Sequence, residues 1–377
     1  MSSSVLRYLT QIDATIDCLL KEPIKKLPNN PKMALRIGVA QMFILETPNH
    51  AAVNTAVDLA TLKWRALVNA VMRNILREEE KYKKIFEDSP KIPKWLLERW
   101  KKNWPNDYLN FIKCIQDIHP HIDIAVKNNV SKWQKELDAE LMPNNVLRLS
   151  ESGLISDKKG YDTGEWWVQD YSSQLPVKCL TIGQDDEILD LCAAPGGKTA
   201  QMLALGAKVH SIDLSDKRII RFKENMRRLK FNPVIDNADI LTYKTEKKWQ
   251  KILLDVPCSS TGTIRKNPDI LYSKNEKSVS NLVNLQTRLL EKSWSLLGKN
   301  GHLIYCNCSL EVEEGEMQII NFLKHHGDCQ IDKISSNLIE DIQDSVTEEG
   351  WLRILPSGKK GVKNRDGFFI ARLKKIS

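Results

Sequence analysis

The feature that most constrains the fold of this chain is a regular alternation of short apolar and longer amphipathic segments after about residue 185. Residues 215–230 and 276–297 carry apolar side chains at helical spacing. Four apolar segments around them have the length of strands: EILDL (187–191), KVHSID (208–213), KILLDV (251–256) and HLIYCN (302–307). Strands that alternate with helices in this way predict a parallel α/β sheet with helices on both faces.

Polar residues gather where these four strands end. They occupy residues 190–198, Asp213, residues 255–258 and residues 306–309. Because parallel strands end at the same edge of a sheet, these side chains are expected to lie together. Ligands bind at that edge in open α/β sheets, so the pattern predicts an active site there.

The most distinctive of these segments is DLCAAPGGKT (190–199). Its last three residues match the end of a phosphate-binding P-loop, but Cys192 stands where that motif requires its first glycine. The dinucleotide pattern Gly-x-Gly-x-x-Gly is also absent, which argues against a nicotinamide or flavin site. Gly196 and Gly197 still allow the backbone to approach a ligand closely, beside the expected start of a helix.

Two acids follow this glycine loop. Asp213 ends the next strand, about 20 residues further on, where an acid accepts hydrogen bonds from ribose hydroxyls. Asp239 lies beyond the following helix. The two acids, without a phosphate-binding loop, predict a ligand that contains adenosine but no phosphate chain.

Two of the eight cysteines stand out in motifs that follow strands. DVPCSSTG (255–262) places Cys258 directly after one strand, and YCNCSL (305–310) places Cys308 at the end of another. A thiol in such a loop acts as a nucleophile when its pKa is lowered. A cysteine phosphatase needs a closer arginine than Arg265, and a cysteine protease needs a histidine that these segments lack. No Cys-x-x-Cys pair or histidine–cysteine set indicates zinc, so no metal is expected.

The charge of the chain favours a polyanionic partner. The net charge is +8, and basic residues cluster in RFKENMRRLK (221–230), KTEKKWQK (244–251) and GKKGVKNR (358–365). Such clusters are typical of proteins that bind nucleic acid. No apolar run approaches the ~20 residues of a membrane span, and the N-terminus does not resemble a signal peptide. A cytoplasmic location is therefore expected.

The part of the chain before the α/β pattern divides into two regions. Residues 34–44 and 51–77 carry apolar side chains at helical spacing. We therefore predict a helical domain over residues 1–85. Residues 86–165 are expected to form a linking region with a small α+β subdomain, followed by the α/β domain over residues 166–377.

Together these motifs resemble a known family. The glycine loop, Asp213, DVPCSSTG followed by IRKNPDI (264–270), and YCNCSLEVEEGE (305–316) are similar in order and spacing to motifs of the RNA cytosine-5 methyltransferases of the Nop/Sun group. PNHAAVNTAVDLA (48–60) and LVNAVMRNIL (67–76) resemble the RNA-binding NusB family. The resemblance implies a Rossmann-like methyltransferase domain with a mainly parallel seven-stranded sheet. An all-α NusB-like domain would precede it, with part of its first helix missing.

The same resemblance implies a cofactor and a set of site residues. S-adenosyl-L-methionine would be bound by Cys192, Ala193, Ala194, Pro195, Gly196, Gly197, Lys198, Asp213, Asp239 and Asp255. Cys308 would be the nucleophile that attacks carbon-6 of a cytosine, and Cys258 would help to release the product. Asp255 would also contact the base, and Arg265 and Lys266 would contact the RNA backbone.

The order of the two domains implies small-subunit (16S) ribosomal RNA as the substrate, because a NusB-like module precedes the catalytic domain in the bacterial enzymes that modify this RNA. Two alternatives stay open: the same chemistry on transfer RNA, and a non-catalytic RNA-binding factor for ribosome assembly. The presence of both Cys258 and Cys308 argues against a non-catalytic factor. The expected enzyme is an S-adenosylmethionine-dependent rRNA (cytosine-5-)-methyltransferase, acting as a monomer without a metal or membrane partner.

Overall fold

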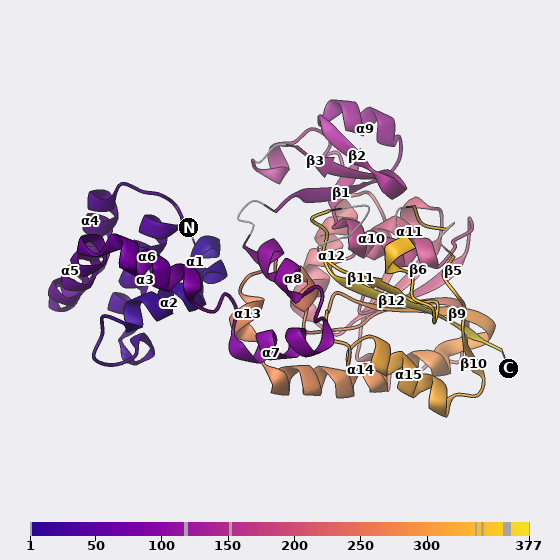
Figure 1. Ribbon diagram of the computed structural model, residues 1–377. Helices are drawn as coiled ribbons and strands as arrows, with labels where there is room; N and C mark the ends of the chain where they lie inside the picture. Colours follow the sequence, from indigo (N-terminus) through magenta and orange to yellow (C-terminus); the bar gives the residue numbers. More distant parts are fainter. Residues whose placement is uncertain are drawn as a thin grey trace. The chain divides into compact units, whose positions relative to one another are not determined.

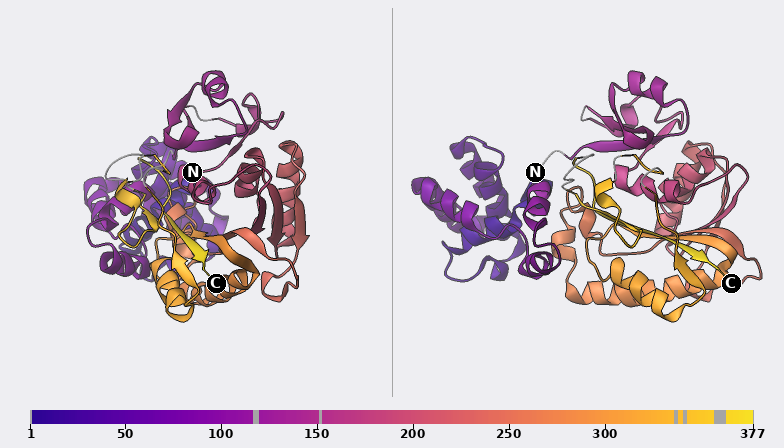
Figure 2. Two further views of the ribbon diagram at one scale, coloured as in Figure 1. Left: turned by 90° about the vertical axis from the view of Figure 1, so that its right-hand side faces the viewer. Right: turned by 45° about the vertical axis from the view of Figure 1, so that its right-hand side comes forward.

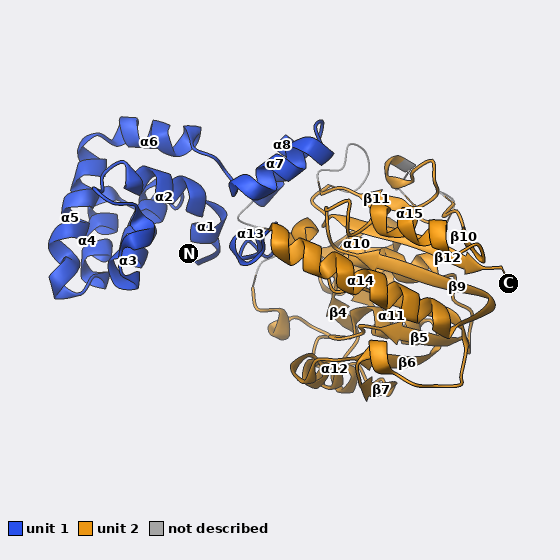
Figure 3. Cartoon of the chain, turned by 90° about the horizontal axis from the view of Figure 1, so that it is seen from below, with its two compact units in different colours: residues 1–118, 264–275 blue, residues 119–263, 276–377 orange. Residues whose placement is uncertain are grey.

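The chain forms two compact units, coloured separately in Figure 3. Unit 1 comprises residues 1–118 and 264–275, and unit 2 comprises residues 119–263 and 276–377. The computed structural model describes residues 2–116, 120–150, 153–335, 338–340, 343–356 and 363–376. Most of the basic cluster expected at residues 358–365 lies outside the described residues. Within the described ranges, no helix is both long and apolar enough to cross a membrane.

The described part of unit 1 is built from helices (Figure 1). They are α1 (Ser2–Arg7), α2 (Leu9–Asp17), the 3-10 turn η1 (Ile24–Lys26), α3 (Asn29–Phe43), α4 (Asn49–Leu59), α5 (Leu62–Arg77), α6 (Glu79–Asp88), α7 (Lys94–Asn103), α8 (Tyr108–Ile115) and α13 (Ile270–Ser273). The apolar faces of α1 to α6 form one core. Gly38 lets α3 lie close to its neighbours, since a Cβ there would be 2.7 Å from Met72 Cε and 2.9 Å from Ala56 Cβ.

Unit 1 includes more of the chain than the helical region expected at residues 1–85. We expected it to end near α6, but α7, α8 and the separate segment 264–275 cluster with it. The Arg7 guanidinium Nη1 donates a hydrogen bond to the Ile115 carbonyl at 2.7 Å. The hydroxyl oxygens of Thr10 and Tyr272 lie 3.2 Å apart. These contacts join residues that are far apart in the chain, so helical periodicity could not predict them.

Unit 2 contains a small antiparallel sheet with the strand order β2-β3-β1-β4. Its elements are β1 (Ile122–Val126), α9 (Val130–Glu136), β2 (Ala139–Met142), β3 (Val146–Leu149) and β4 (Trp166–Val168). Ile124, Trp133, Leu147 and Trp166 form its buried core. Figure 2 shows this sheet and α9 as a lobe of unit 2. A small α+β region is thus present, and it clusters with the rest of unit 2.

The main sheet of unit 2 has the strand order β10-β12-β9-β8-β5-β6-β7, and β11 pairs with β12 as an eighth strand. The strands are β5 (Glu187–Leu191), β6 (Lys208–Asp213), β7 (Val234–Asn237), β8 (Trp249–Asp255), β9 (Leu297–Asn307), β10 (Cys329–Ile331), β11 (Leu352–Ile354) and β12 (Phe368–Lys375). The strands from β7 to β9 pair in parallel, and β12 is antiparallel to its partners. The predicted α/β sheet and its four strands are confirmed.

Helices cover both faces of this sheet (Figure 1). They are α10 (Tyr171–Cys179), α11 (Gly197–Ala204), α12 (Asp216–Arg228), α14 (Glu276–Leu296) and α15 (Glu316–His325). Successive strand residues point to opposite faces. Ile188 and Leu253 therefore enter the core that includes residues of α10 and α11, while Leu189 and Leu254 enter the core that includes residues of α14 and α15. Burial on both faces explains why the sequences of these strands are nearly continuous runs of apolar residues.

Candidate active site

The glycine loop connects β5 to α11, and two of its residues have positive φ angles, which most residue types rarely adopt. Cys192 has a φ of 61° and Gly196 has a φ of 99°. A Cβ at Gly196 would lie 2.8 Å from Met226 Cε, so glycine is required by both the backbone angle and the space. Asn225 Nδ2 donates to the Pro195 carbonyl at 2.9 Å, which anchors the loop to α12.

Asp213, at the end of β6, holds this loop in place. Its Oδ2 accepts a hydrogen bond from the Ala194 amide at 3.0 Å, and its Oδ1 accepts one from the Ser215 amide at 3.0 Å. Arg218 Nη1 lies 3.4 Å from Asp213 Oδ2, and the same guanidinium donates to the Ala194 carbonyl. Arg218 was not among the predicted site residues. The only signal for it in the sequence is its place just after Asp213, in the first turn of a basic helix.

A cavity of about 250 Å³, called here the cofactor cavity, opens beside Asp213. Its lining combines the two predicted acids with apolar side chains: Cys192, Asp213, Leu214, Ser215, Arg218, Asp239, Ile240, Pro257, Leu285 and Leu289. Asp239 Oδ1 accepts a hydrogen bond from the Leu241 amide at 2.9 Å. The fold therefore brings Asp213 and Asp239, which are far apart in the sequence, to the same cavity.

A second cavity of about 200 Å³, called here the ion-pair cavity, lies along the glycine loop and is lined in part by Asp190, Lys198 and Asp255. Lys198 Nζ lies 2.7 Å from Asp255 Oδ2. Thr199 Oγ1 donates to Asp190 Oδ2 at 2.6 Å, while Asp190 Oδ1 is buried and has no hydrogen-bond partner among the described residues. Burial raises the pKa of Asp190 to about 7.

The two predicted thiols meet beside this ion pair. Cys258, in the loop after β8, and Cys308, just after β9, have sulfur atoms 3.5 Å apart. A hydrogen bond from the Cys258 thiol lowers the pKa of Cys308, and the same bond, together with burial, raises the pKa of Cys258. The pair therefore favours a thiolate at Cys308 and a thiol at Cys258. Cys306 is fully buried in the sheet core.

A buried network that the sequence analysis missed holds both thiol loops. The Glu314 carboxylate is fully buried, and its Oε1 accepts hydrogen bonds from the Ser259 amide and from Gln286 Nε2, each at 2.9 Å. Its Oε2 accepts from the Ser259 hydroxyl, which lies 2.9 Å from the Ser309 hydroxyl. Ser259 and Ser309 directly follow the two cysteines. The acidic run in YCNCSLEVEEGE was the available signal, but nothing in the sequence shows which acid is buried.

The two residues expected to contact RNA differ in how far they are exposed. Arg265 is only 2% exposed, and its contact with the RNA backbone stays a prediction. Its neighbour Lys266 is half-buried. Burial of an arginine is a tertiary property that a basic dipeptide in the sequence does not reveal. Among the described residues, no group of three or more His, Cys, Asp and Glu side chains could hold a metal ion.

Fold and site together define a class of protein. A doubly wound sheet carries, at the carboxyl ends of its strands, both a cavity lined by two acids and a pair of adjacent thiols. This is the arrangement of an α/β enzyme that binds its ligand at the carboxyl ends of its parallel strands.

Comparison with known proteins identifies the family. The family model described as 16S rRNA methyltransferase RsmB/F matches residues 177–374, and the NusB family matches residues 1–77. The chain is 32% identical, over all of its length and 89% of the relative's, to the ribosomal RNA small subunit methyltransferase B of Photorhabdus laumondii. The chain belongs to the RsmB/F family of 16S rRNA methyltransferases, and it is an S-adenosylmethionine-dependent rRNA methyltransferase.

Solved structures share the fold. The crystal structure of PH0851 superimposes with a TM-score of 0.81 and 25% identity, over 99% of this chain and 88% of that one. NSun6 from Pyrococcus horikoshii, solved with SFG, gives a TM-score of 0.66 with 20% identity, over 76% of this chain and 98% of that one. These similarities confirm the Rossmann-like architecture.

Proposed function

We propose that this protein transfers a methyl group from S-adenosylmethionine to carbon-5 of a cytosine in 16S ribosomal RNA, through a covalent bond between Cys308 and the base. The observation that carries the proposal is the pair of sulfur atoms 3.5 Å apart beside the Lys198–Asp255 ion pair. A single nucleophilic cysteine is compatible with many different reactions and would not by itself indicate this one. Two adjacent thiols of opposite pKa shift suit a reaction in which one forms a bond to the base and the other assists its release.

The residues present fit S-adenosylmethionine. The buried Asp190 Oδ1 has no partner among the described residues, and the ammonium of the cofactor is a donor that would satisfy it. We assign the ribose to Asp213, the adenine side to Asp239, and the rest of the contact to the backbone of residues 192–198. When bound, the cofactor supplies an electrophilic methyl group on a sulfonium. SFG, an analogue of this cofactor, is bound by NSun6 from Pyrococcus horikoshii.

The chain's own residues then act on the base. The thiolate of Cys308 donates an electron pair to carbon-6 of cytosine, and the double bond shifts so that carbon-5 becomes nucleophilic. After carbon-5 has taken the methyl group, its proton passes to a base, the double bond between carbon-5 and carbon-6 re-forms, and Cys308 Sγ leaves carbon-6 as the thiolate. We assign Cys258 to this last stage. Asp255, beside Lys198, is assigned to a hydrogen bond near the ring nitrogen of the base.

The substrate is proposed from the relatives and from the NusB match. The P. laumondii relative is described as a ribosomal RNA small subunit methyltransferase. Transfer RNA remains the alternative substrate for the same chemistry. In either RNA, the target base has to leave its stack to reach Cys308.

The test is methyl transfer from labelled S-adenosylmethionine to unmodified 16S ribosomal RNA, with a transfer RNA pool run in parallel and both digested to nucleosides. Label in 5-methylcytidine from ribosomal RNA is the expected result. Label only in transfer RNA would move the proposal to the alternative substrate. Label in a different nucleoside would contradict the cytosine-5 chemistry.

A further inference from the structure

Unit 2 contains a third cavity, called here the outer cavity, that the proposed chemistry does not use. Its volume is about 280 Å³, and residues 195–197 of the glycine loop form part of its lining. Tyr161, Trp167 and Val168 of the small lobe form one wall, and Asn225 and Arg228 of α12 form another. Val168 and two residues of the glycine loop also line the ion-pair cavity, so the two cavities adjoin.

The aromatic wall of the outer cavity is held in a fixed position. The Arg228 guanidinium carbon lies 4.0 Å from the centre of the Tyr161 ring, and its Nη1 donates to the Tyr161 carbonyl at 2.6 Å. Gly164, with a φ of 77°, sits so close to α12 that an added Cβ would be 2.0 Å from the Arg228 carbonyl oxygen. The Trp167 indole donates to Gln169 Oε1 at 2.7 Å, and Gln169 lines the ion-pair cavity.

Positive charge collects around this wall. Lys127, just after β1, has its Nζ 4.5 Å from the centre of the Phe231 ring. Burial lowers the pKa of Lys127, and the positive charges of Lys230 and Arg228 lower it further, while Glu165 opposes the shift. Three cations thus lie within electrostatic reach of one another. Arg228 Nε is also buried without a partner among the described residues, so a hydrogen-bond donor is left unused.

We infer that the outer cavity binds a second, unstacked nucleobase of the substrate RNA, from a nucleotide close to the target cytosine. This inference rests on the proposed function, because it gives a further contact to the same RNA. Aromatic rings and guanidinium groups are the surfaces on which proteins hold bases of unpaired RNA. Flipping the target base removes the stacking partner of its neighbour, and the outer cavity adjoins the ion-pair cavity, whose lining includes Asp255, the residue assigned to the target base. The cations of Lys127, Arg228 and Lys230 are complementary to the phosphates that join the two nucleotides.

The test combines an abasic scan with substitutions of Tyr161. The RNA is the shortest 16S fragment that the wild-type protein methylates, with an abasic nucleotide at each of the positions flanking the target. At one position we expect kcat/KM of the wild-type protein to fall about tenfold, in the range of base–aromatic stacking. Tyr161→Leu should cause a similar fall on the intact RNA and no further fall on that abasic RNA. Tyr161→Phe, which keeps the ring, should behave like the wild type.

Two results would overturn the inference. One is a wild-type protein that tolerates an abasic nucleotide at every flanking position. The other is an additive penalty, in which Tyr161→Leu and the abasic nucleotide each reduce kcat/KM independently. Calorimetric titration with S-adenosylmethionine checks that both variants are folded. If intact RNA receives no methyl group on any cytosine, the proposed function itself fails, and the inference fails with it.

A second measurement on the wild-type protein does not depend on the folding of a variant. Photo-crosslinking of RNA with 4-thiouridine at the sensitive position should attach the RNA to Tyr161, Trp167 or Val168, as mapped by mass spectrometry. A crosslink confined to other parts of the chain would contradict the inference.

Discussion

At the scale of single residues, protonation of the Asp190 carboxyl group makes the charge of the site depend on pH. Its pKa is raised to about 7 by burial, so the carboxyl group is largely protonated at pH 6 in the free protein. If it accepts the cofactor ammonium, it must lose this proton on binding. The affinity for S-adenosylmethionine should therefore weaken as pH falls below about 7, by up to about tenfold per unit. Calorimetric titrations between about pH 5.5 and 7 measure this change across the raised pKa.

Asp190→Asn should flatten that dependence and weaken binding at pH 7, because the amide carries no charge to titrate. Asp185→Asn is a matched control, since Asp185 is exposed near the opposite end of β5 and should leave the profile unchanged. A wild-type dissociation constant that does not vary with pH would rule out a contact between the ammonium and Asp190.

The two thiols make a second prediction at this scale. Cys308→Ala should abolish methyl transfer and keep cofactor binding, whereas Cys258→Ala should leave a covalent protein–RNA adduct that survives denaturing electrophoresis. Cys258→Ala also removes the hydrogen bond that lowers the pKa of Cys308. The pH profile for alkylation of Cys308 by iodoacetamide should then move to higher pH, with about a tenfold slower reaction near neutral pH for each unit.

Peptide mass spectrometry separates Cys308 from the other cysteines, and the exposed Cys18 reports any general change in reactivity. An unchanged alkylation profile for Cys308 in the Cys258→Ala protein would show that the sulfur–sulfur hydrogen bond does not tune the nucleophile.

At the scale of elements, Glu314 joins the loop after β8, helix α14 and the segment after β9. Truncation by Glu314→Ala would leave the Ser259 amide, the Ser259 hydroxyl and one Gln286 bond without their acceptor. Each unsatisfied buried group costs about 1–3 kcal/mol, so we expect the free energy of unfolding to fall by about 3 kcal/mol or more, measured by urea denaturation. Glu349→Ala, at an exposed position, should change it by less than about 0.5 kcal/mol.

The same substitution should loosen the thiol pair. Because the Glu314 carboxylate, in the segment after β9, would no longer hold the Ser259 amide and hydroxyl of the loop after β8, the pH profile for Cys308 alkylation should move toward that of an ordinary thiol. If the stability falls but the alkylation profile stays as in the wild type, Glu314 supports the fold without positioning the thiols.

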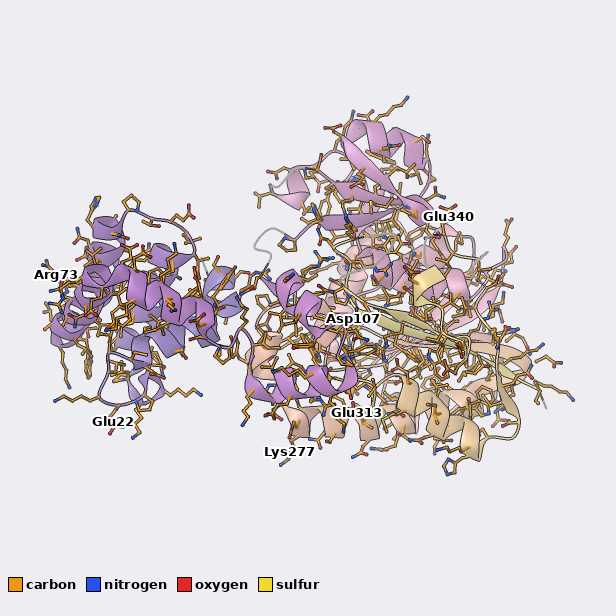
Figure 4. The ribbon with its side chains drawn as sticks, viewed as in Figure 1. Glu22, Arg73, Asp107, Lys277, Glu313 and Glu340 are labelled. Atoms are coloured by element: carbon orange, nitrogen blue, oxygen red, sulfur yellow. The ribbon has the colours of Figure 1, made fainter. Side chains whose placement is uncertain are left out.

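At the scale of the whole molecule, the two units suggest separate tasks for RNA binding and catalysis. Arg73, labelled in Figure 4, and Arg77 are exposed on α5 of unit 1, within the NusB match. Reversing both charges should weaken binding of a 16S RNA fragment and lower its salt dependence, by roughly 0.7–0.9 in log–log slope for each phosphate that the protein no longer neutralises. Affinity for S-adenosylmethionine should stay unchanged. Lys94→Glu, on α7 of the same unit, is the control, and an equal effect from it would contradict a specific role for α5.

The strands and helices of the main sheet were predictable because their signals are local. Apolar runs such as residues 187–191 and 251–256 are bounded by polar residues, and the connections between strands leave little choice of topology. The boundary of unit 1 was not predictable in this way. Segment 264–275 clusters with helices that lie far earlier in the chain, and no periodicity records such a contact.

The features of the candidate site likewise fall into those that the sequence could predict and those that it could not. Chain order and residue type alone placed Cys258, Cys308, Asp213 and the glycine loop at strand ends, because parallel strands bring their carboxyl ends to one edge of the sheet. Whether a charged side chain is buried depends on what packs over it. Only the tertiary structure could therefore show that Arg265 is covered, that Glu314 holds both thiol loops, and that one sulfur donates to the other.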